Sequence, residues 1–472
     1  MQKGFTPKLI PRSRFNPRVF LMVVIFAIFG GYLFIHFSNA STQTGDINGD
    51  NTVNITDLSL LLSSYDQNTT HCITNGAYTC DLSSPSDGIV DVFDLSILLS
   101  NYGKTVSQLQ AGHINFMEKT APETDTYTNN PTATTQQWMR DHWTRALVFS
   151  TYWDTKLSWY PNGWAYADSY AIYNPSALAT QHPEWILKDA SGNKLYIPFG
   201  CSSGSCPQFA ADIGSPAWRQ YYIDNAKSLI SKGYKGIFVD DVNMDMDVGD
   251  GNGTQVAPID PRTGAAMTDT AWKSYFADFM EQLRTAIPNA EIVHNAIWFA
   301  GGGTHDATDS YIIREIKAAD YINTERGFND SGLTGGTYIW SVYALMHYID
   351  NVHTYGSNVI LQSYVSDIPS MEYNLSGYFL VNNGSDYIST TGGSLPDSWW
   401  SAYDINLGNA LGARYQWNGL WRRDFSNGFV LLNEPGASTK SVGLGSTFKN
   451  TSGQLVSNVS LGAASGAVLL KQ

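Results

Sequence analysis

From about residue 140 to residue 390, short β-rich segments alternate with segments of helical periodicity. One unit is especially clear, because Ser215 and Pro216 begin a helix, Gly233 ends it, and the apolar run GIFVDD (236–241) follows. This alternation is typical of a parallel α/β fold. Eight such units in about 250 residues have the size of a (β/α)8 barrel. The sequence therefore predicts a TIM-like (β/α)8 barrel over residues 110–405.

The expected barrel strands can be assigned in chain order. They are residues 146–153, 164–173, 208–212, 236–241, 291–295, 319–325, 358–365 and 385–390. Helices are expected from Thr268 and over 337–354, and the glycine-rich stretch 249–264 is expected to be a loop. After Gly408, short strands and turns predict a C-terminal β-sandwich over residues 408–472.

The N-terminus predicts where the chain acts. Residues 1–18 carry five basic and no acidic side chains, and an uncharged apolar run follows over 19–37. This order favours a cytoplasmic segment, a transmembrane helix that anchors the protein in the cell membrane as a single span, and an extracellular remainder. The alternative is cleavage near Ala40, after a small-x-small site, which would release a secreted protein. Both alternatives export the rest of the chain.

The four cysteines fit an exported protein. They form two closely spaced pairs, Cys72 with Cys80 and Cys201 with Cys206. In an oxidising compartment two local disulfides are the economical interpretation. A zinc site is the alternative, and it is the weaker one because neither pair has CxxC spacing and no histidine cluster accompanies them.

Charge and aromatic content limit the partners. The formal net charge is −14, although the N-terminal segment is basic, so the exported part is more acidic still. Such a surface repels phosphate backbones, and nucleic acid is therefore not expected as a partner. The 14 Trp, 27 Tyr and 21 Phe residues give a foldable chain with many rings.

Residues 44–104 contain an internal repeat. DLSLLLSSY (57–65) recurs as DLSILLSNY (94–102), and each copy follows an acidic loop and begins an amphipathic helix. In the first loop, residues bearing oxygen fall at positions 1, 3, 5, 7, 9 and 12, which is the spacing that surrounds Ca²⁺ in a twelve-residue loop. The expected ligands are Asp46, Asn48, Asp50, Thr52, Asn54 and Asp57.

The second loop departs from this spacing. Counting back from the twelfth position places Ser83 and Pro85 at positions 1 and 3, and proline has no ligating side chain. A two-residue insertion restores an aspartate as the first ligand, and this site is expected to bind Ca²⁺ more weakly. The expected ligands are Asp81, Asp87, Ile89 through its carbonyl, Asp91 and Asp94.

The duplicated loop and helix, with Asp at the twelfth position, resemble a type I dockerin. The resemblance covers about 60 residues and implies a small α-helical module with structural Ca²⁺ and a cohesin-like partner. The segment between Cys72 and Cys80 departs from the usual pattern. The alternative is a spacer that Ca²⁺ holds folded and that has no such partner, because a domain this small needs metal to fold.

Candidate catalytic groups lie where the predicted strands end. In (β/α)8 barrels, reactive side chains sit at the carboxyl ends of strands. Asp240 and Asp241 end the fourth predicted strand and Glu325 ends the sixth. Glycoside hydrolysis uses two such carboxylates, so Asp240 is assigned as nucleophile or base and Glu325 as the general acid, with a pKa expected to be raised. The alternative for each is a helix cap or one half of an ion pair, and Asp241 is equally expected to orient its neighbours.

Further residues near these strand ends are candidate substrate contacts. They are Trp153, Asp168, His294, Asn295, Trp298, Arg326 and Asp330. For His294, a buried position with its hydrogen bonds satisfied is an equal alternative. Sugar rings stack on flat aromatic side chains, so two or three of Trp153, Trp159, Trp164, Trp185, Trp298, Trp399 and Trp400 are expected in the cleft and the others in the core.

The stretches AADIGSPAWRQYYIDNAKSLISKGYKGIFVDDVNMD, INTERG and GLWRRDFSNGFVLLNEPG resemble uncharacterised glycoside hydrolases of the α-amylase and melibiase superfamily. The likeness covers about residues 140–470. It implies that Asp240, which follows the apolar run on strand four, is the nucleophile. The α-amylase pattern has its acid on strand five, where this chain has Asn295, so Glu325 on strand six takes that role.

The favoured function is extracellular hydrolysis of O-glycosidic bonds in a poly- or oligosaccharide, without a cofactor for catalysis. A non-catalytic surface adhesin that binds glycans through a degenerate barrel is the main alternative. A metal-dependent enzyme such as a deacetylase ranks last, because no HxH or HExxH motif lies near a predicted strand end.

Overall fold

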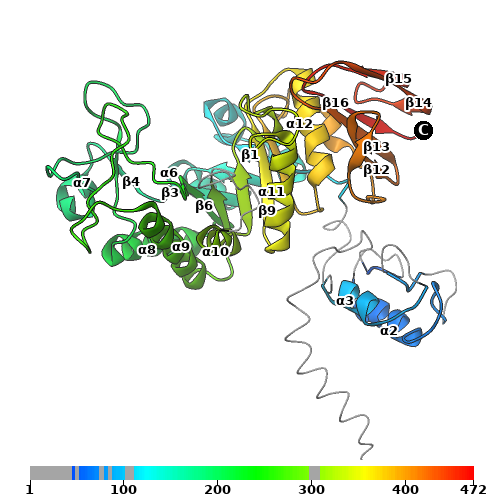
Figure 1. Ribbon diagram of the computed structural model, residues 1–472, viewed down its shortest axis with the longest axis horizontal. Coiled ribbons are helices and arrows are strands. Elements are labelled where there is room, and N and C mark those ends of the chain that lie inside the picture. The colour runs from blue at the N-terminus through cyan, green and yellow to red at the C-terminus, as the bar shows by residue number, and fades with distance from the viewer. Residues whose placement is uncertain are drawn as a thin grey trace, which may run out of the picture. The chain divides into compact units, whose positions relative to one another are not determined.

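The computed structural model describes residues 45–47, 53–73, 79–82, 88–100, 102, 111–296 and 309–472. These residues form two compact units (Figure 1), one containing the loop–helix repeat and ending at Tyr102, the other containing the described residues from Ala111 onward. The predicted transmembrane segment 19–37 lies outside the described residues. Within the described ranges, no helix has the length and apolar character needed to span a bilayer.

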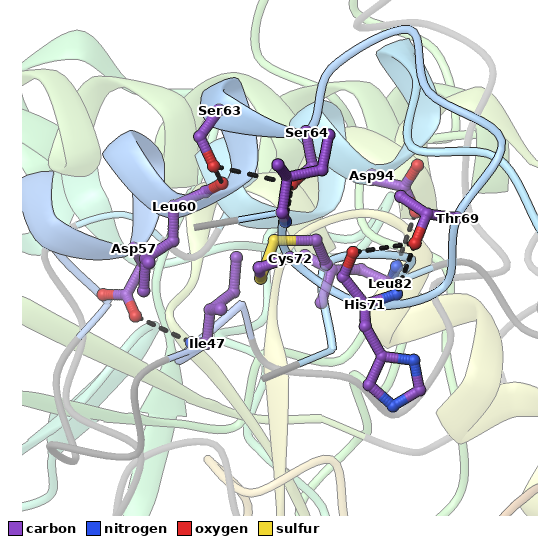
Figure 2. Close-up of a disulfide and its surroundings, with 12 residues drawn as sticks. Ile47, Asp57, Leu60, Ser63, Ser64, Thr69, His71, Cys72, Leu82 and Asp94 are labelled. Atoms are coloured by element: carbon purple, nitrogen blue, oxygen red, sulfur yellow. Dashed lines mark hydrogen bonds between the residues drawn. A yellow bond between two sulfur atoms is a disulfide. The ribbon is translucent and has the colours of Figure 1, made fainter. Parts of the chain in front are cut away.

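The smaller unit contains two helices that begin in the same way. They are α2 (Ile55–Ser63) and α3 (Val92–Ser100). The buried carboxylate of Asp57 accepts a hydrogen bond from the amide N–H of Ile47 at 2.7 Å, and the buried carboxylate of Asp94 accepts one from the amide of Leu82 at 2.6 Å (Figure 2). In each loop the donor directly follows an aspartate, Asp46 or Asp81. Asp46 and Asp81 therefore occupy equivalent positions in the two loops, which agrees with the two-residue insertion predicted for the second loop.

Both predicted disulfides are present. Cys72 bonds to Cys80 in the smaller unit (Figure 2) and Cys201 bonds to Cys206 in the larger one. Among the described residues no cysteine is free. The alternative of a zinc site made by these thiols is therefore wrong.

The larger unit is built on a closed barrel of eight parallel strands, which confirms the predicted TIM-like fold. The strand order is β1-β10-β9-β8-β7-β6-β3-β2. The strands are β1 (Asn115–Lys119), β2 (Arg145–Val148), β3 (Gly163–Asp168), β6 (Gly236–Asp240), β7 (Glu291–Asn295), β8 (Tyr321–Thr324), β9 (Asn358–Ser363) and β10 (Tyr387–Thr390). Because the strands are parallel, all of their carboxyl ends meet at one mouth of the barrel.

Helices connect the strands of this barrel, and most of them surround it, whereas α7 lies apart from the barrel (Figure 1). They are α4 (Asp125–Thr128), α5 (Ala133–His142), α6 (Ser150–Trp153), α7 (Ala177–Gln181), α8 (Pro216–Lys232), α9 (Asp269–Ala286), α10 (Ser310–Ala318), α11 (Val342–Thr354) and α12 (Ile368–Val381). Helix α8 begins and ends as predicted, because Ser215 caps its amino end and Gly233 adopts a left-handed φ of 107° after its last residue. The glycine-rich stretch 249–264 is a loop, as predicted.

One of the predicted barrel strands is wrong, and the first two end earlier than predicted, at Val148 and Asp168. Residues 208–212 were expected as the third strand, but β5 (Gln208–Ala210) pairs antiparallel with β4 (Ala171–Tyr173) in a separate sheet. Residues 169–215 leave the barrel after β3, and Figure 1 shows α7 and β4 at the end of this unit opposite the C-terminal sheet. The first predicted strand is also shorter than 146–153, because Phe149 ends it and α6 follows. The true first strand, β1, was missed.

The residues of β6 show why this segment forms a barrel strand between β3 and β7. Ile237, Phe238 and Val239 are buried, as expected for a parallel strand covered on both faces. A Cβ atom on Gly236 would lie 2.0 Å from the carbonyl oxygen of Glu291 on β7, so only glycine allows the two strands to approach at this point.

The C-terminal part forms one antiparallel sheet with the order β11-β12-β13-β16-β14-β15. Val430, Leu432 and Val468 belong to the same apolar core as the barrel helices, so one sheet face packs against the barrel unit. A second apolar cluster joins residues of β12, β13 and β16 to residues of β14 and β15, as in the predicted sandwich. The strands are β11 (Tyr415–Trp417), β12 (Leu420–Phe425), β13 (Gly428–Asn433), β14 (Lys440–Lys449), β15 (Leu455–Leu461) and β16 (Ser465–Leu470).

Candidate active site

Polar side chains gather where adjacent barrel strands end. Asp168 is the last residue of β3 and pairs in register with Asp240, the last residue of β6. Asn295 ends β7, and Glu325 directly follows β8. The barrel therefore brings the sequence-predicted Asp168, Asp240, Asn295 and Glu325 to one mouth, where such barrels carry their reactive groups.

Asp240 is held by three hydrogen-bond donors. Its Oδ2 accepts from the hydroxyl of Tyr166 at 2.6 Å. Its Oδ1 accepts from the Asn295 side-chain amide at 2.7 Å and from the backbone N–H of Asp241 at 2.9 Å. Donors of this kind stabilise the ionised form of a carboxylate and fix its orientation. The donors from β3, β7 and the loop after β6 therefore fix the orientation of the Asp240 carboxylate.

Glu325 lies next to Asp240 and is exposed to solvent. Its Oε2 accepts from the same Asn295 amide nitrogen at 3.4 Å, and its Oε1 accepts from the hydroxyl of Tyr364. Because one nitrogen bonds both carboxylates, their nearest oxygens lie at most about 6 Å apart. Two carboxylates at this separation across an open mouth match the arrangement of a glycoside hydrolase.

The residue after each of these carboxylates has an unusual backbone. Asp241 has a φ of 55° and Arg326 has a φ of 73°, both in the left-handed region that side chains other than glycine rarely adopt. Gly327 follows with a φ of 50°, and a Cβ atom there would lie 3.0 Å from Asn374 Oδ1. Strained backbone held by its surroundings is common at functional sites, and in this protein it turns the chain just beyond Asp240 and Glu325.

Asp168 and Asp241 are two largely buried, neighbouring carboxyl groups, and the charge of Asp241 acts on Asp168. Burial, followed by the charges of Asp240, Asp247 and Glu325, raises the pKa of Asp241 to about 7. Burial and then the charges of Asp241 and Asp240 raise the pKa of Asp168 well above its ordinary value. Because two ionised carboxylates repel each other, the pair retains a proton into the neutral range.

The raised pKa of Asp241 predicts a dependence of stability on pH. Between its unfolded value of 3.8 and about 7, the folded state binds more protons than the unfolded state. The free energy of unfolding should therefore fall as the pH rises through this window. In Asp241→Asn we expect this slope to be reduced and the protein at pH 8 to be more stable by about 4 kcal/mol. Urea unfolding followed by tryptophan fluorescence checks this, since all 14 Trp residues follow residue 110.

Asp154→Asn is a control with the opposite sign. The hydrogen bond from Lys232 lowers the pKa of Asp154, so this carboxylate stabilises the folded protein once it is ionised, and that contribution disappears as the pH falls. We expect Asp154→Asn to lose stability at pH 8. If Asp241→Asn were instead less stable than the wild type at pH 8, the proposed repulsion in the acidic cluster would be excluded.

None of the carboxylates of Asp168, Asp240, Asp241 and Glu325 is paired with a lysine or arginine within the described part of the chain. Acidic residues in another groove of the same unit are paired with a cation. A groove of about 480 Å³ between α8 and α9 also has acidic lining residues, but there Asp278 and Glu281 both pair with Arg314. Carboxylates left without a cation at a strand end are the pattern expected of a reactive site.

Exposed rings surround the carboxylates. Phe149 follows β2, is 44% exposed and contacts the ring of Tyr166 at a centroid distance of 5.0 Å. Tyr173 on β4 is 55% exposed, and Tyr364 after β9 is 43% exposed. The charges of Asp168 and Asp240 help to raise the pKa of Tyr173, so this hydroxyl lies near the acidic cluster. Flat rings beside carboxylates can stack on the apolar face of a sugar.

Other residues predicted as substrate contacts lie elsewhere. His294 is fully buried, and its Nδ1 is 2.6 Å from Glu315 on α10, so it faces away from the mouth. Trp153 is 2% exposed and packs in the core, with Gly163 close to its indole nitrogen. Asp330 accepts a hydrogen bond from the amide of Gly332 in a turn. We therefore do not retain these three as contacts.

The remaining candidates have mixed positions. Arg326 is exposed directly after Glu325, and its charge acts on Tyr364, so it stays a candidate. Trp298 lies outside the described residues. Trp164 and Trp185 are buried, whereas Trp159, Trp399 and Trp400 are partly buried against the core. Six of the thirteen described tryptophans are thus buried and none of the thirteen is exposed, whereas tyrosine and phenylalanine provide the exposed rings.

Sequence analysis missed three residues of the site. Tyr166 precedes Asp168 by two positions, and Asn323 precedes Glu325 by two, so each shares a strand face with a predicted residue. Tyr364 directly follows β9, at the same kind of strand end that identified Asp240. Counting back two positions from Asp168 and Glu325 would have found Tyr166 and Asn323, whereas Tyr364 follows from the rule that reactive side chains lie at strand ends.

Comparisons with known proteins agree with this geometry. A family model described as "Hypothetical glycosyl hydrolase family 15" matches residues 147–429. Among curated proteins, none matches the chain. The match begins in β2 and ends in β13, so it covers the described strand ends that carry Asp168, Asp240, Asn295 and Glu325.

Several solved structures are distantly similar. The glycoside hydrolase domain of PelA from Pseudomonas aeruginosa is 13% identical, covering 59% of this chain and 94% of that one, with a TM-score of 0.35. A maltogenic alpha-amylase, AmyB, from Thermotoga neapolitana is 12% identical over 77% and 100%, with a TM-score of 0.45. The alpha-galactosidase TtGalA from Thermus thermophilus is 11% identical over 66% of each chain, with a TM-score of 0.39. Identities and scores this low carry no argument about activity.

Proposed function

This chain belongs to the hypothetical glycosyl hydrolase family 15, and from that membership we propose that it hydrolyses O-glycosidic bonds of a poly- or oligosaccharide. One observation carries the proposal. The Asn295 amide bonds both Asp240 and Glu325, which holds the two carboxylates at most about 6 Å apart at the barrel mouth. Retaining hydrolases separate their carboxylates by about 5–5.5 Å and inverting ones by about 6.5–9.5 Å, so the bound favours retention.

The proposed reaction has two steps. Asp240 attacks the anomeric carbon, the bond to the leaving oxygen breaks, and protonated Glu325 transfers its proton to that oxygen. Glu325 then removes a proton from water, which attacks the anomeric carbon and releases the sugar from Asp240. Tyr166 and Asn295 hold Asp240 for the attack, while Phe149 and Tyr173 are placed to contact the sugar ring.

We place this activity outside the cell, at the membrane or in secreted form. Basic residues followed by the apolar run 19–37 support export, and so do the two disulfides, which persist in oxidising compartments. A cohesin-like partner for the repeat unit stays a prediction.

A panel of polysaccharides tests the function. The full-length chain and its Asp240→Asn variant are incubated with glycans that differ in sugar and linkage, and new reducing ends are measured. We expect release from at least one glycan by the wild type alone. Binding without any release by the wild type would contradict hydrolysis and support a surface adhesin instead.

We propose that structural Ca²⁺ binds the repeat unit. The donor set is made of oxygens, and Asp57 and Asp94 are buried with matching hydrogen bonds in the two loops. Of the expected ligands, Asp46, Asn54, Asp57, Asp81, Ile89, Asp91 and Asp94 lie within the described residues, while Asn48, Asp50, Thr52 and Asp87 do not. The ion would neutralise these carboxylates and join each loop to its helix.

Removing Ca²⁺ should loosen this unit alone. With EGTA we expect hydrogen exchange at residues 55–63 and 92–100 to accelerate at least tenfold, because folding of a unit this small depends on the metal. Thermal unfolding followed by tryptophan fluorescence should not change, since the unit contains no Trp. Equal exchange rates in Ca²⁺ and in EGTA would contradict the assignment.

A further inference from the structure

A row of amide side chains crosses the inside of the barrel beneath the carboxylates. Asn295 on β7, Asn323 on β8 and Gln362 on β9 lie on three adjacent strands, and Asn295 pairs in register with Asn323. Asn323 is fully buried and Gln362 is 2% exposed. The row therefore lies in the barrel interior, and only its Asn295 end reaches the carboxylates at the mouth.

Asn323 is the hydrogen-bond donor to both of its neighbours in this row. The Asn323 amino group donates to Asn295 Oδ1 at 2.8 Å and to Gln362 Oε1 at 2.9 Å. Because the Asn295 oxygen faces Asn323, the Asn295 amino group faces the other way. It donates to Asp240 at 2.7 Å and to Glu325 at 3.4 Å.

This arrangement leaves two buried atoms without hydrogen bonds. Asn323 Oδ1 and Gln362 Nε2 have no partner among the described residues. Buried polar atoms without partners are costly and uncommon, and those that persist in native structures call for an explanation. The explanation we favour is that the amino group of Asn323 must serve both neighbours, which leaves its oxygen unused.

We propose that Asn323 is a positioning residue, whose amino group keeps the Asn295 amide directed at Asp240 and Glu325. The inference rests on the proposed function, in which Asp240 must be ionised and Glu325 must stay close to it. If Asn323 could not donate, the Asn295 amide could reverse. Its oxygen would then face two carboxylates, and Asp240 would exchange a donor for a repelling lone pair.

Several charged or titratable groups surround Asp240. Tyr166 and Asp168 face it from β3, Tyr173 from β4, Asp241 from its own loop, Glu325 from β8 and Tyr364 from β9. None of these is a cation, and three are acids. The donors from Tyr166, Asn295 and the Asp241 backbone therefore oppose the acids in setting how readily Asp240 is ionised.

Asn323→Asp tests the proposal, because aspartate accepts hydrogen bonds but cannot donate. In ¹³C NMR of the full chain labelled at Asp carboxyl carbons, with Asp240→Asn identifying the signal, we expect the pKa of Asp240 to rise by about one unit. On a hydrolysed glycan, we expect kcat to fall roughly 10²-fold to 10³-fold with KM changed less than threefold. The acid limb of the rate profile should move to higher pH by about one unit.

Two further variants separate positioning from a general loss of structure. Asn323→Leu removes the donor without adding a charge. We expect the pKa of Asp240 and the acid limb to move in the same direction as in Asn323→Asp, and the fold-loss in kcat to be about one tenth as large. It carries the test if Asn323→Asp fails to fold. Asn433→Asp is the matched control, because this buried asparagine donates to three carbonyls in the C-terminal sheet, far along the chain from the site. It should lose stability while Asp240 titrates as in the wild type.

The proposal is overturned if Asp240 titrates at the wild-type pH in the folded Asn323 variants, or if Asn433→Asp shifts it equally. The NMR titration needs no substrate. A wild type that cleaves no glycan would therefore contradict the proposed function, while a shifted Asp240 would still support the positioning role.

Discussion

Replacing Asp240 with asparagine is expected to lower kcat by at least about 10⁴-fold on any glycan that the wild type cleaves. An amide is too weak a nucleophile to form the ester with the anomeric carbon, so the first step is lost and not merely slowed. The side chain keeps its shape, and Tyr166 and Asn295 can still bond it. The fold should therefore be preserved, and initial rates of reducing-end release measure the effect.

Asp330→Asn is the matched control for this prediction. Asp330 is another aspartate near the end of β8, but the structure shows its carboxylate accepting a hydrogen bond within a turn. We expect its rate to stay within about threefold of the wild type. An Asp240→Asn enzyme with a rate near that of Asp330→Asn would exclude Asp240 as the nucleophile.

Glu325→Gln should give a loss that depends on the leaving group. A sugar leaving oxygen needs a proton as its bond breaks, so the variant should lose about 10²-fold to 10⁴-fold with a natural glycan. A dinitrophenyl glycoside of the same sugar leaves without that proton, and its rate of first bond cleavage should stay within tenfold of the wild type. Pre-steady-state release of dinitrophenol measures this step.

Asp241 is the other candidate acid, because its pKa is raised to about 7. Its carboxyl group is largely buried beside Asp168, whereas Glu325 is exposed at the mouth. We therefore expect Asp241→Asn to slow natural and activated substrates by similar factors. If the leaving-group dependence were found in Asp241→Asn and not in Glu325→Gln, the two roles would have to be exchanged.

The barrel could be predicted because its signals are local. Ser215, Pro216 and Gly233 determine the ends of α8, and the apolar run before Asp240 is typical of a strand covered on both faces. Strand membership is not local. Residues 208–210 have the composition of a barrel strand, but they pair with 171–173 in the excursion. One strand before β6 was missed and one was added wrongly, so the prediction still counted β6 as the fourth barrel strand.

The residues of the candidate site were predicted where their position at a strand end identified them, and missed where contacts between side chains determine their role. The end of a strand identified Asp240, Glu325 and Asn295. The same rule placed His294 one position too near the site, because adjacent residues on a strand point to opposite faces and His294 faces α10. The left-handed backbone at Asp241, next to Asp240, is not indicated by any sequence pattern.

The stereochemistry of hydrolysis tests the central claim most directly. The shared Asn295 amide holds Asp240 and Glu325 at most about 6 Å apart, below the separation of about 6.5–9.5 Å found in inverting hydrolases, so we expect the sugar to pass through a bond to Asp240. Proton NMR during hydrolysis of a cleaved glycan reads the configuration of the product before it equilibrates. We predict the same anomeric configuration as in the cleaved bond, and the opposite configuration would contradict the pairing of Asp240 with Glu325.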